Sequence, residues 1–139
     1  MMPTLYEEAS GEKLLAMARV FFSKAQSDEL LAPLFGPASP DHAEHLTGWF
    51  SALFGGPQNY LTERGDLRWV IWSHRNMKIS DAQRARWVRL MMDAAAEVEM
   101  REAFMRSFDR FADSISRNVQ ANSHLEEDVL RRTIGYDEE

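Results

Sequence analysis

Hydrophobic residues along the first third of the chain recur every three or four positions, which is the period of an α-helix. The pattern predicts a first long helix from Gly11 to about Gln26. Ser27 is a good N-cap for a second, short helix over residues 28–34, which the Gly36-Pro37 pair would end. The apolar stripe of the first helix comprises Leu14, Ala18, Phe21, Phe22 and Ala25.

A third helix is predicted over residues 39–54. Ser39 is a suitable cap, Pro40 fits the first helical position, and glycine followed by proline at residues 55–57 should stop the helix. His42 lies four residues before Leu46 and therefore shares its helical face. The apolar stripe comprises Leu46, Trp49, Phe50 and Leu53.

Residues 57–79 form the least regular stretch. Its best strand candidate, Trp69 to Trp72, is short and lies inside a segment that resembles a loop. A connection of this length is usually functional or disordered. The many aromatic and apolar residues argue against disorder, so we expect a functional segment.

The last part of the chain again has helical spacing. Ser80 and Gln83 form a capping box that opens a helix to about Val98, and a further long helix is predicted from about Met100 to Asn118. Ser123 with Glu126 forms a second capping box, which predicts a short C-terminal helix to Arg132. The long helix carries the stripe Phe104, Phe108, Phe111 and Ile115. Together these elements predict an all-α fold.

Composition narrows the class of protein. The chain has 139 residues, which is the size of one domain, with 45% hydrophobic and 27% charged residues, as in ordinary globular proteins. A net charge of −6 disfavours nucleic acid as a partner. The absence of cysteine excludes disulfides, thiolate catalysis and cysteine-bound metal centres. Neither a secretory signal nor a membrane-spanning run is recognisable, so we expect a cytoplasmic protein without membrane contact.

Four sequence pieces and one tryptophan, in this order and spacing, resemble the truncated haemoglobins, and within them the second group ("O" type). The resemblance covers roughly residues 5–119. Its pieces are Leu5-Tyr6-Glu7-Glu8 with Gly11-Glu12; DELLAPLF from Asp28 to Phe35; WFSALFGGPQNY from Trp49 to Tyr60 with Arg64-Gly65; and His74-x-x-Met77-x-Ile79, with Trp87 thirteen positions after the histidine.

The resemblance implies a globin-like, truncated two-over-two helical sandwich that binds haem b. Residues 1–139 would form one domain, with the globin core at about 5–119 and an extra C-terminal helix in the extension 120–139. Haem would lie between the helix of residues 39–54 and the segment around His74. His74 would be the proximal iron ligand, since a neutral imidazole suits haem iron and leaves the opposite face free for a gas. The alternative is an ordinary surface or core histidine.

The residues expected on the gas-binding side depart from the family pattern. Phe22 occupies the position where the family usually has a tyrosine that hydrogen-bonds the ligand, and Phe35 would wedge the haem. The remaining N–H donors are Trp87, which in the second group faces the gas, and His42. His42 either contacts the ligand or gates its access, or else it points to solvent. Leu46 would pack over the iron.

Other residues would complete the haem pocket. Met77 and Ile79 belong to the motif that follows the proximal histidine, whereas Phe50 and Met91 contact either haem or the core. Haem propionates need cations or hydroxyl donors, for which Arg64 and Tyr60 are candidates, together with Arg68, Arg75, Lys78 and His45. The family commonly has arginine just before the proximal histidine, but this chain has Ser73. His42 and His45 with Asp41 and Glu44 could instead hold a metal, but a solvated helix face is the better interpretation.

The leading functional hypothesis is reversible binding of oxygen, and of nitric oxide or carbon monoxide, at ferrous haem. Nitric oxide dioxygenase or peroxidase-like turnover would need a separate reductase, because no flavin or nicotinamide motif is present. The alternative is a globin-shaped sensor or interaction module that has no gas-carrying role, with or without haem. A helical enzyme of another kind lacks any catalytic constellation in this sequence. We expect a monomer or a homodimer.

Overall fold

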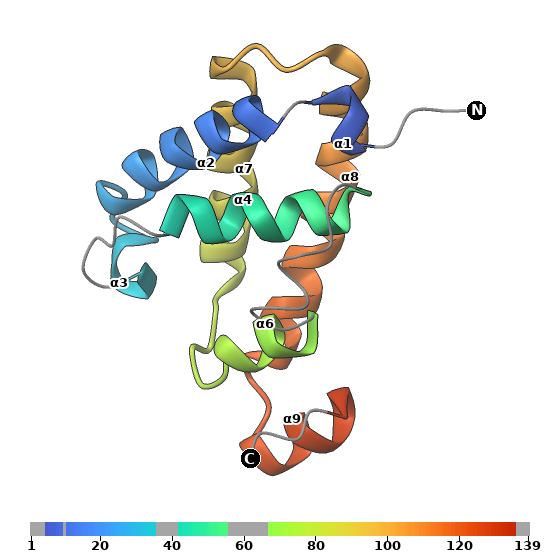
Figure 1. The fold of residues 1–139 in the computed structure, drawn as a ribbon. Helices are drawn as coiled ribbons and strands as arrows, with labels where there is room; N and C mark the ends of the chain where they lie inside the picture. Colours follow the sequence, from blue (N-terminus) through green and yellow to red (C-terminus); the bar gives the residue numbers. More distant parts are fainter. Residues whose placement is uncertain (1–4, 10, 36–41, 56–66, 136–139) are drawn as a thin grey trace.

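The structure, a computed structural model, describes residues 5–9, 11–35, 42–55 and 67–135 (Figure 1). The described residues form helices joined by turns and contain no strand, so the predicted all-α class is confirmed. The helices are α1 (Leu5–Glu8), α2 (Gly11–Gln26), α3 (Ala32–Phe35), α4 (His42–Leu53), α6 (Leu67–Ser73), α7 (Asp81–Glu97), α8 (Glu102–Asn122) and α9 (Glu127–Ile134).

The four long helices make two packed layers. Helix α2 crosses α4, and both lie over the pair α7 and α8; α2 packs directly on α7, and α7 on α8 (Figure 1). This is the arrangement that the predicted two-over-two sandwich requires. The short helix α6 lies near the far end of α8, where α9 packs beside it. None of the described helices has both the length and the apolar content needed to cross a bilayer.

Aromatic side chains fill the centre of the core. Phe50 of α4 and Phe54, just beyond it, meet the α8 stripe edge-on, with ring centroids 5.8 Å apart for Phe50 and Phe108 and 5.0 Å apart for Phe54 and Phe111. Such edge-to-face pairs add about 0.5–1.5 kcal/mol each beyond the burial of their area. The predicted stripes of α4 and α8 therefore face each other, which fixes one wall of the space beside them.

The second predicted helix is shorter than residues 28–34. The Asp28 carboxylate accepts hydrogen bonds from the backbone N–H groups of Leu30 (3.0 Å) and Leu31 (3.2 Å), so residues 28–31 form a turn and α3 starts at Ala32. A short acidic side chain competes for backbone groups in this way and favours turns over helix interiors. Asp28 also pairs with Arg86, which ties this turn to α7.

The strand candidate Trp69 to Trp72 is wrong, because residues 67–73 form the helix α6. Ile71 and Trp72 are buried, whereas Trp69 is 38% exposed. The helix buries these adjacent residues on one side by packing against Leu130 of α9. A helix of seven residues is too short for its period to be recognised from sequence.

The two predicted capping boxes have opposite outcomes. At Ser80 the box is confirmed: its hydroxyl accepts from Gln83 N–H, and the Gln83 side chain accepts from Ser80 N–H. At Ser123 the prediction is wrong, because α8 continues to Asn122 and Ser123 ends it. Glu126 is the residue that precedes α9, and it makes no side-chain cap.

Candidate functional site

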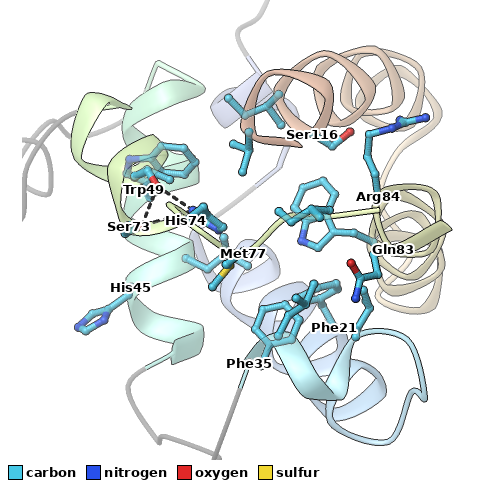
Figure 2. A pocket seen from close by; sticks show the side chains of 18 of the residues that line it. Phe21, Phe35, His45, Trp49, Ser73, His74, Met77, Gln83, Arg84 and Ser116 are labelled. Carbon is cyan, nitrogen blue, oxygen red and sulfur yellow. Dashed lines mark hydrogen bonds between the residues drawn. The ribbon is translucent and has the colours of Figure 1, made fainter. Parts of the chain in front are cut away.

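A cavity of about 410 Å³ lies between the two helical layers and α6 (Figure 2). This volume is within the range of small-molecule and cofactor sites, roughly 300–1,000 Å³. Most of the lining is apolar or aromatic, and it comes from α2, α3, α4, α6, α7 and α8. A mainly apolar molecule would bury its surface well in such a cavity.

The cavity gathers most of the predicted site residues that the structure describes. Met91 is the exception: it is fully buried in the core and does not line the cavity. Tyr60, Arg64 and the side chain of His42 lie outside the described residues. The predicted residues that line the cavity are Phe22, Phe35, Leu46, Phe50, His74, Met77, Ile79 and Trp87.

The imidazole of His74 is fixed by a backbone carbonyl one helical turn earlier. Its Nδ1 lies 2.7 Å from Val70 O and 3.3 Å from Ser73 Oγ. A carbonyl only accepts, so Nδ1–H donates to Val70, and the lone pair of the neutral ring is on Nε2. Metal-binding histidines commonly carry such a bond on the second nitrogen, because it fixes the tautomer and the ring orientation. Ser73 also donates to Val70 O, at 2.7 Å.

Burial keeps His74 neutral. Desolvation lowers the pKa of His74 below its usual value of 6.5, and the hydrogen bond to Val70 opposes that shift only in part. A neutral ring with a free Nε2 is the form that coordinates iron or another transition metal. Figure 2 shows His74 projecting from the end of α6 into the cavity, with Met77 beside it.

Aromatic rings make up the wall contributed by α2, α3 and α7. Phe21 lies 6.0 Å from Trp87 and 5.2 Å from Phe22, and Phe22 lies 5.7 Å from Phe35, between ring centroids. All of these pairs are edge-on, an arrangement that holds each ring in place. Phenylalanine offers no hydrogen-bond donor, so Trp87 carries the only donor group in this aromatic cluster.

One polar atom in the lining is buried without a partner. Trp49 is 6% exposed, and its indole N–H makes no hydrogen bond with the described residues. Buried donors are nearly always satisfied, so an orphaned donor in a cavity wall suggests that a bound group completes it. Sequence reasoning placed Trp49 in an apolar stripe and in a family motif, and it assigned no role to the indole nitrogen.

Within the described part of the chain, few of the side chains suggested for an anionic ligand line the cavity. Arg84 lines it but pairs with Asp113 (3.3 Å), and His45 lines it while pointing away from His74 (Figure 2). Arg68 and Arg75, which the sequence suggested for an anionic ligand, do not line the cavity, because they contact Gly135 and Glu127 near the C-terminus. Among the described residues, no cluster of three histidine or acidic side chains could hold a metal ion.

The lowered pKa of His74 predicts how the stability of the haem-free protein depends on pH. Below about pH 6.5 the unfolded chain protonates His74 before the folded chain does, so the free energy of unfolding should fall as the pH drops toward the folded-state pKa. Urea unfolding at about pH 7.5 and about pH 5.5 measures this loss. The His74→Gln variant should lose less stability between the two pH values, and an equal loss in both proteins would contradict the prediction.

Comparison with known proteins identifies relatives of this fold. The profile of a family described as bacterial-like globin matches residues 4–117. The haemoglobin of Chloroflexus aurantiacus has a TM-score of 0.75 at 23% identity, and the match covers 85% of this chain and 98% of that one. The truncated oxygen-avid haemoglobin of Bacillus subtilis has a TM-score of 0.75 at 22% identity, covering 84% and 98%.

A third solved structure has the same fold. The group II haemoglobin of Agrobacterium tumefaciens, described as 2-on-2, has a TM-score of 0.70 at 18% identity, covering 86% of this chain and 95% of that one. Among curated proteins, none matches the sequence significantly. The truncated-globin resemblance predicted from sequence is confirmed, and its group assignment is consistent with these neighbours.

Proposed function

Because the chain belongs to the bacterial-like globin family, we propose that it binds haem b through His74 and reversibly binds diatomic gases, oxygen first. The observation that carries the proposal is the state of His74. Its ring is neutral, its Nδ1–H is held by Val70 O at 2.7 Å, and it lines an aromatic cavity of about 410 Å³. Nε2 is the atom available to coordinate iron.

The residues of the cavity fit a haem. Its broad apolar surface matches a lining dominated by phenylalanine, tryptophan, leucine and methionine. The orphaned indole N–H of Trp49 supplies a buried donor for a polar substituent of the ligand. Bound haem would supply an iron centre that can bind a diatomic gas.

Residues of the protein enclose the ligand, donate a hydrogen bond to the gas and hold the propionates. Leu46 of α4 and the rings of Phe22, Phe35 and Trp87 wall the cavity, exclude water and restrict the size of the ligand. Trp87 is the donor that we assign to the gas ligand, with His42 as a second candidate on α4. Arg84 and His45 are the described cavity-lining side chains that we assign to the propionates, with Tyr60 and Arg64 as further candidates from the sequence.

Oxygen, nitric oxide and carbon monoxide are the proposed ligands. Storage or transfer of oxygen requires only the binding equilibrium. Nitric oxide dioxygenase or peroxidase-like turnover would require electrons from a separate reductase, since this sequence carries no flavin or nicotinamide motif.

A titration of the purified protein with haem, followed by absorption spectroscopy, tests the proposal. We expect stoichiometric uptake of haem, with an intense absorption band that shifts on reduction and shifts again when carbon monoxide is added to the reduced protein. A chain that takes up no haem would refute the proposal. It would favour the haem-free sensor or interaction module.

A further inference from the structure

We infer that residues 123–135, which we call the C-terminal segment, position His74 by holding the chain on both sides of it. The inference rests on the proposed function, because it concerns how the haem ligand is presented. The family match ends at residue 117, and the haemoglobins of Chloroflexus and Bacillus subtilis match only 84–85% of this chain while 98% of their own chains is covered. The C-terminal segment therefore lies beyond the residues that the family profile matches.

The apolar side of α9 holds the residues just before His74. Leu130 is fully buried and packs with Ile71 and Trp72 of α6. The guanidinium group of Arg131 lies 4.9 Å from the centre of the Trp72 ring, and that of Arg75 lies 4.6 Å from it. Apolar burial combined with the cation–π contact of Arg131 fixes α6 against α9, whereas the contact of Arg75 is local, between α6 and the turn that follows it. Since His74 follows α6 directly, the position of this helix sets the position of the His74 backbone.

Polar contacts from the C-terminal segment hold the residues just after His74. Asn76 donates to the Glu127 carboxylate at 2.8 Å, and Arg75 pairs with the same oxygen at 3.6 Å. Ser123, which is 1% exposed, makes two further contacts, one with Lys78 and one with Ile79. Ile79 N–H donates to Ser123 Oγ at 3.0 Å, and Lys78 N–H donates to Ser123 O at 3.2 Å.

A third contact joins the same two segments. His124 Nε2 lies 2.7 Å from Ile79 O, and because a carbonyl only accepts, the imidazole is the donor. Every backbone polar group of Ile79 is thus bonded to the C-terminal segment. The loop that follows His74 is tied at Asn76, Lys78 and Ile79, on both sides of the cavity-lining Met77.

The tied loop contains two residues with left-handed backbone conformations. Asn76 has φ 65° and Lys78 has φ 49°. Lysine rarely adopts this region, and such a conformation persists where surrounding contacts over-determine it. The hydrogen bonds to Glu127 and Ser123 fall on these two residues. Without these hydrogen bonds the backbone of the loop would relax, and His74 would lose its fixed position relative to the cavity.

Glu127→Ala in the full-length protein, with Asp128→Ala as its control, tests the polar contacts. Both changes remove one carboxylate from the first turn of α9, but Asp128 is exposed and has no ion pair or hydrogen bond within the part of the chain that the structure describes. We expect Glu127→Ala to raise the rate of haem loss roughly 2- to 30-fold. It should also shift the iron–histidine stretching band in the resonance Raman spectrum of the ferrous protein, whereas Glu127→Gln, which keeps an acceptor for Asn76, should restore much of both properties.

Leu130→Ala tests the apolar contact in the same way. Its control is Val129→Ala, which shortens the neighbouring side chain that is 38% exposed. We expect the Leu130 variant to change haem loss and the Raman band, and the Val129 variant to resemble the unmodified protein.

Amide hydrogen exchange of residues 74–79 in the haem-free protein separates failure of this inference from failure of the proposed function. If the unmodified chain takes up no haem, the proposed function fails, and faster exchange in Glu127→Ala than in Asp128→Ala would still support a held loop. If exchange, haem loss and the Raman band are the same in test and control variants, the inference is overturned. Faster exchange with unchanged haem loss and Raman band would also overturn it, since the contact would then only stabilise the fold.

Discussion

His74→Ala is expected to weaken haem retention on the order of 100-fold or more, since even partners that only orient a metal ligand contribute 10- to 100-fold. The variant removes a cavity-lining imidazole whose Nδ1 is held by a backbone carbonyl, at 2.7 Å. It keeps the apolar cavity, so haem should still associate, but without its protein ligand. Haem transfer to an excess of an acceptor globin measures retention, and the absorption spectrum reports the loss of the axial ligand.

Free imidazole should restore much of the axial coordination in His74→Ala, because it can enter the space that the side chain vacates. His45→Ala is the matched control: it deletes another cavity-lining histidine, which points away from His74 (Figure 2). That variant should keep the spectrum of the unmodified protein. Unchanged haem retention in His74→Ala, or a lost axial ligand in His45→Ala, would assign the iron ligand to another residue.

The sequence predicted those parts of the fold that depend on local patterns. The stripes of α2, α4 and α8 have helical spacing over many residues, so their faces could be assigned before the structure was known. Ser80 and Gln83 lie three residues apart and form their predicted capping box. His74 was predicted as the iron ligand through the spacing of its motif, and in the structure its carbonyl partner Val70 is the residue one turn earlier on α6.

The parts that failed depend on contacts between distant residues. Ser123 has the spacing of a capping box with Glu126, but its hydroxyl instead donates to Gln120 O and accepts from Ile79 N–H, which lies 44 positions away. Arg75 was one of several candidate cations for an anionic ligand, whereas in the structure it pairs with Glu127 of α9 and lies beside Trp72. Pairings of this kind are set by tertiary packing and leave no periodic trace in a single sequence.

Phe22→Tyr is expected to slow oxygen dissociation about 10- to 100-fold. Phe22 lines the cavity, its ring lies 5.7 Å from Phe35, and the family usually has tyrosine at this position. A hydroxyl on this ring adds an O–H donor to a wall where phenylalanine offers none. A hydrogen bond to a ligand with partial negative charge contributes about 1.5–3 kcal/mol, which corresponds to the expected change in rate. Stopped-flow oxygen dissociation from the ferrous protein measures it.

Two controls separate hydrogen bonding from a change in packing. Carbon monoxide is the less polar ligand, so its dissociation from Phe22→Tyr should change much less than that of oxygen. Phe111→Tyr adds the same hydroxyl to a half-buried ring of α8 that does not line the cavity, and it should leave oxygen dissociation unchanged. Equal slowing of both gases in Phe22→Tyr would indicate that the hydroxyl narrows the path of release. No slowing of oxygen would place the bound gas on a side of the cavity that α2 does not reach, and Trp87, which packs on Phe21 of α2, would then lose its assigned role as well.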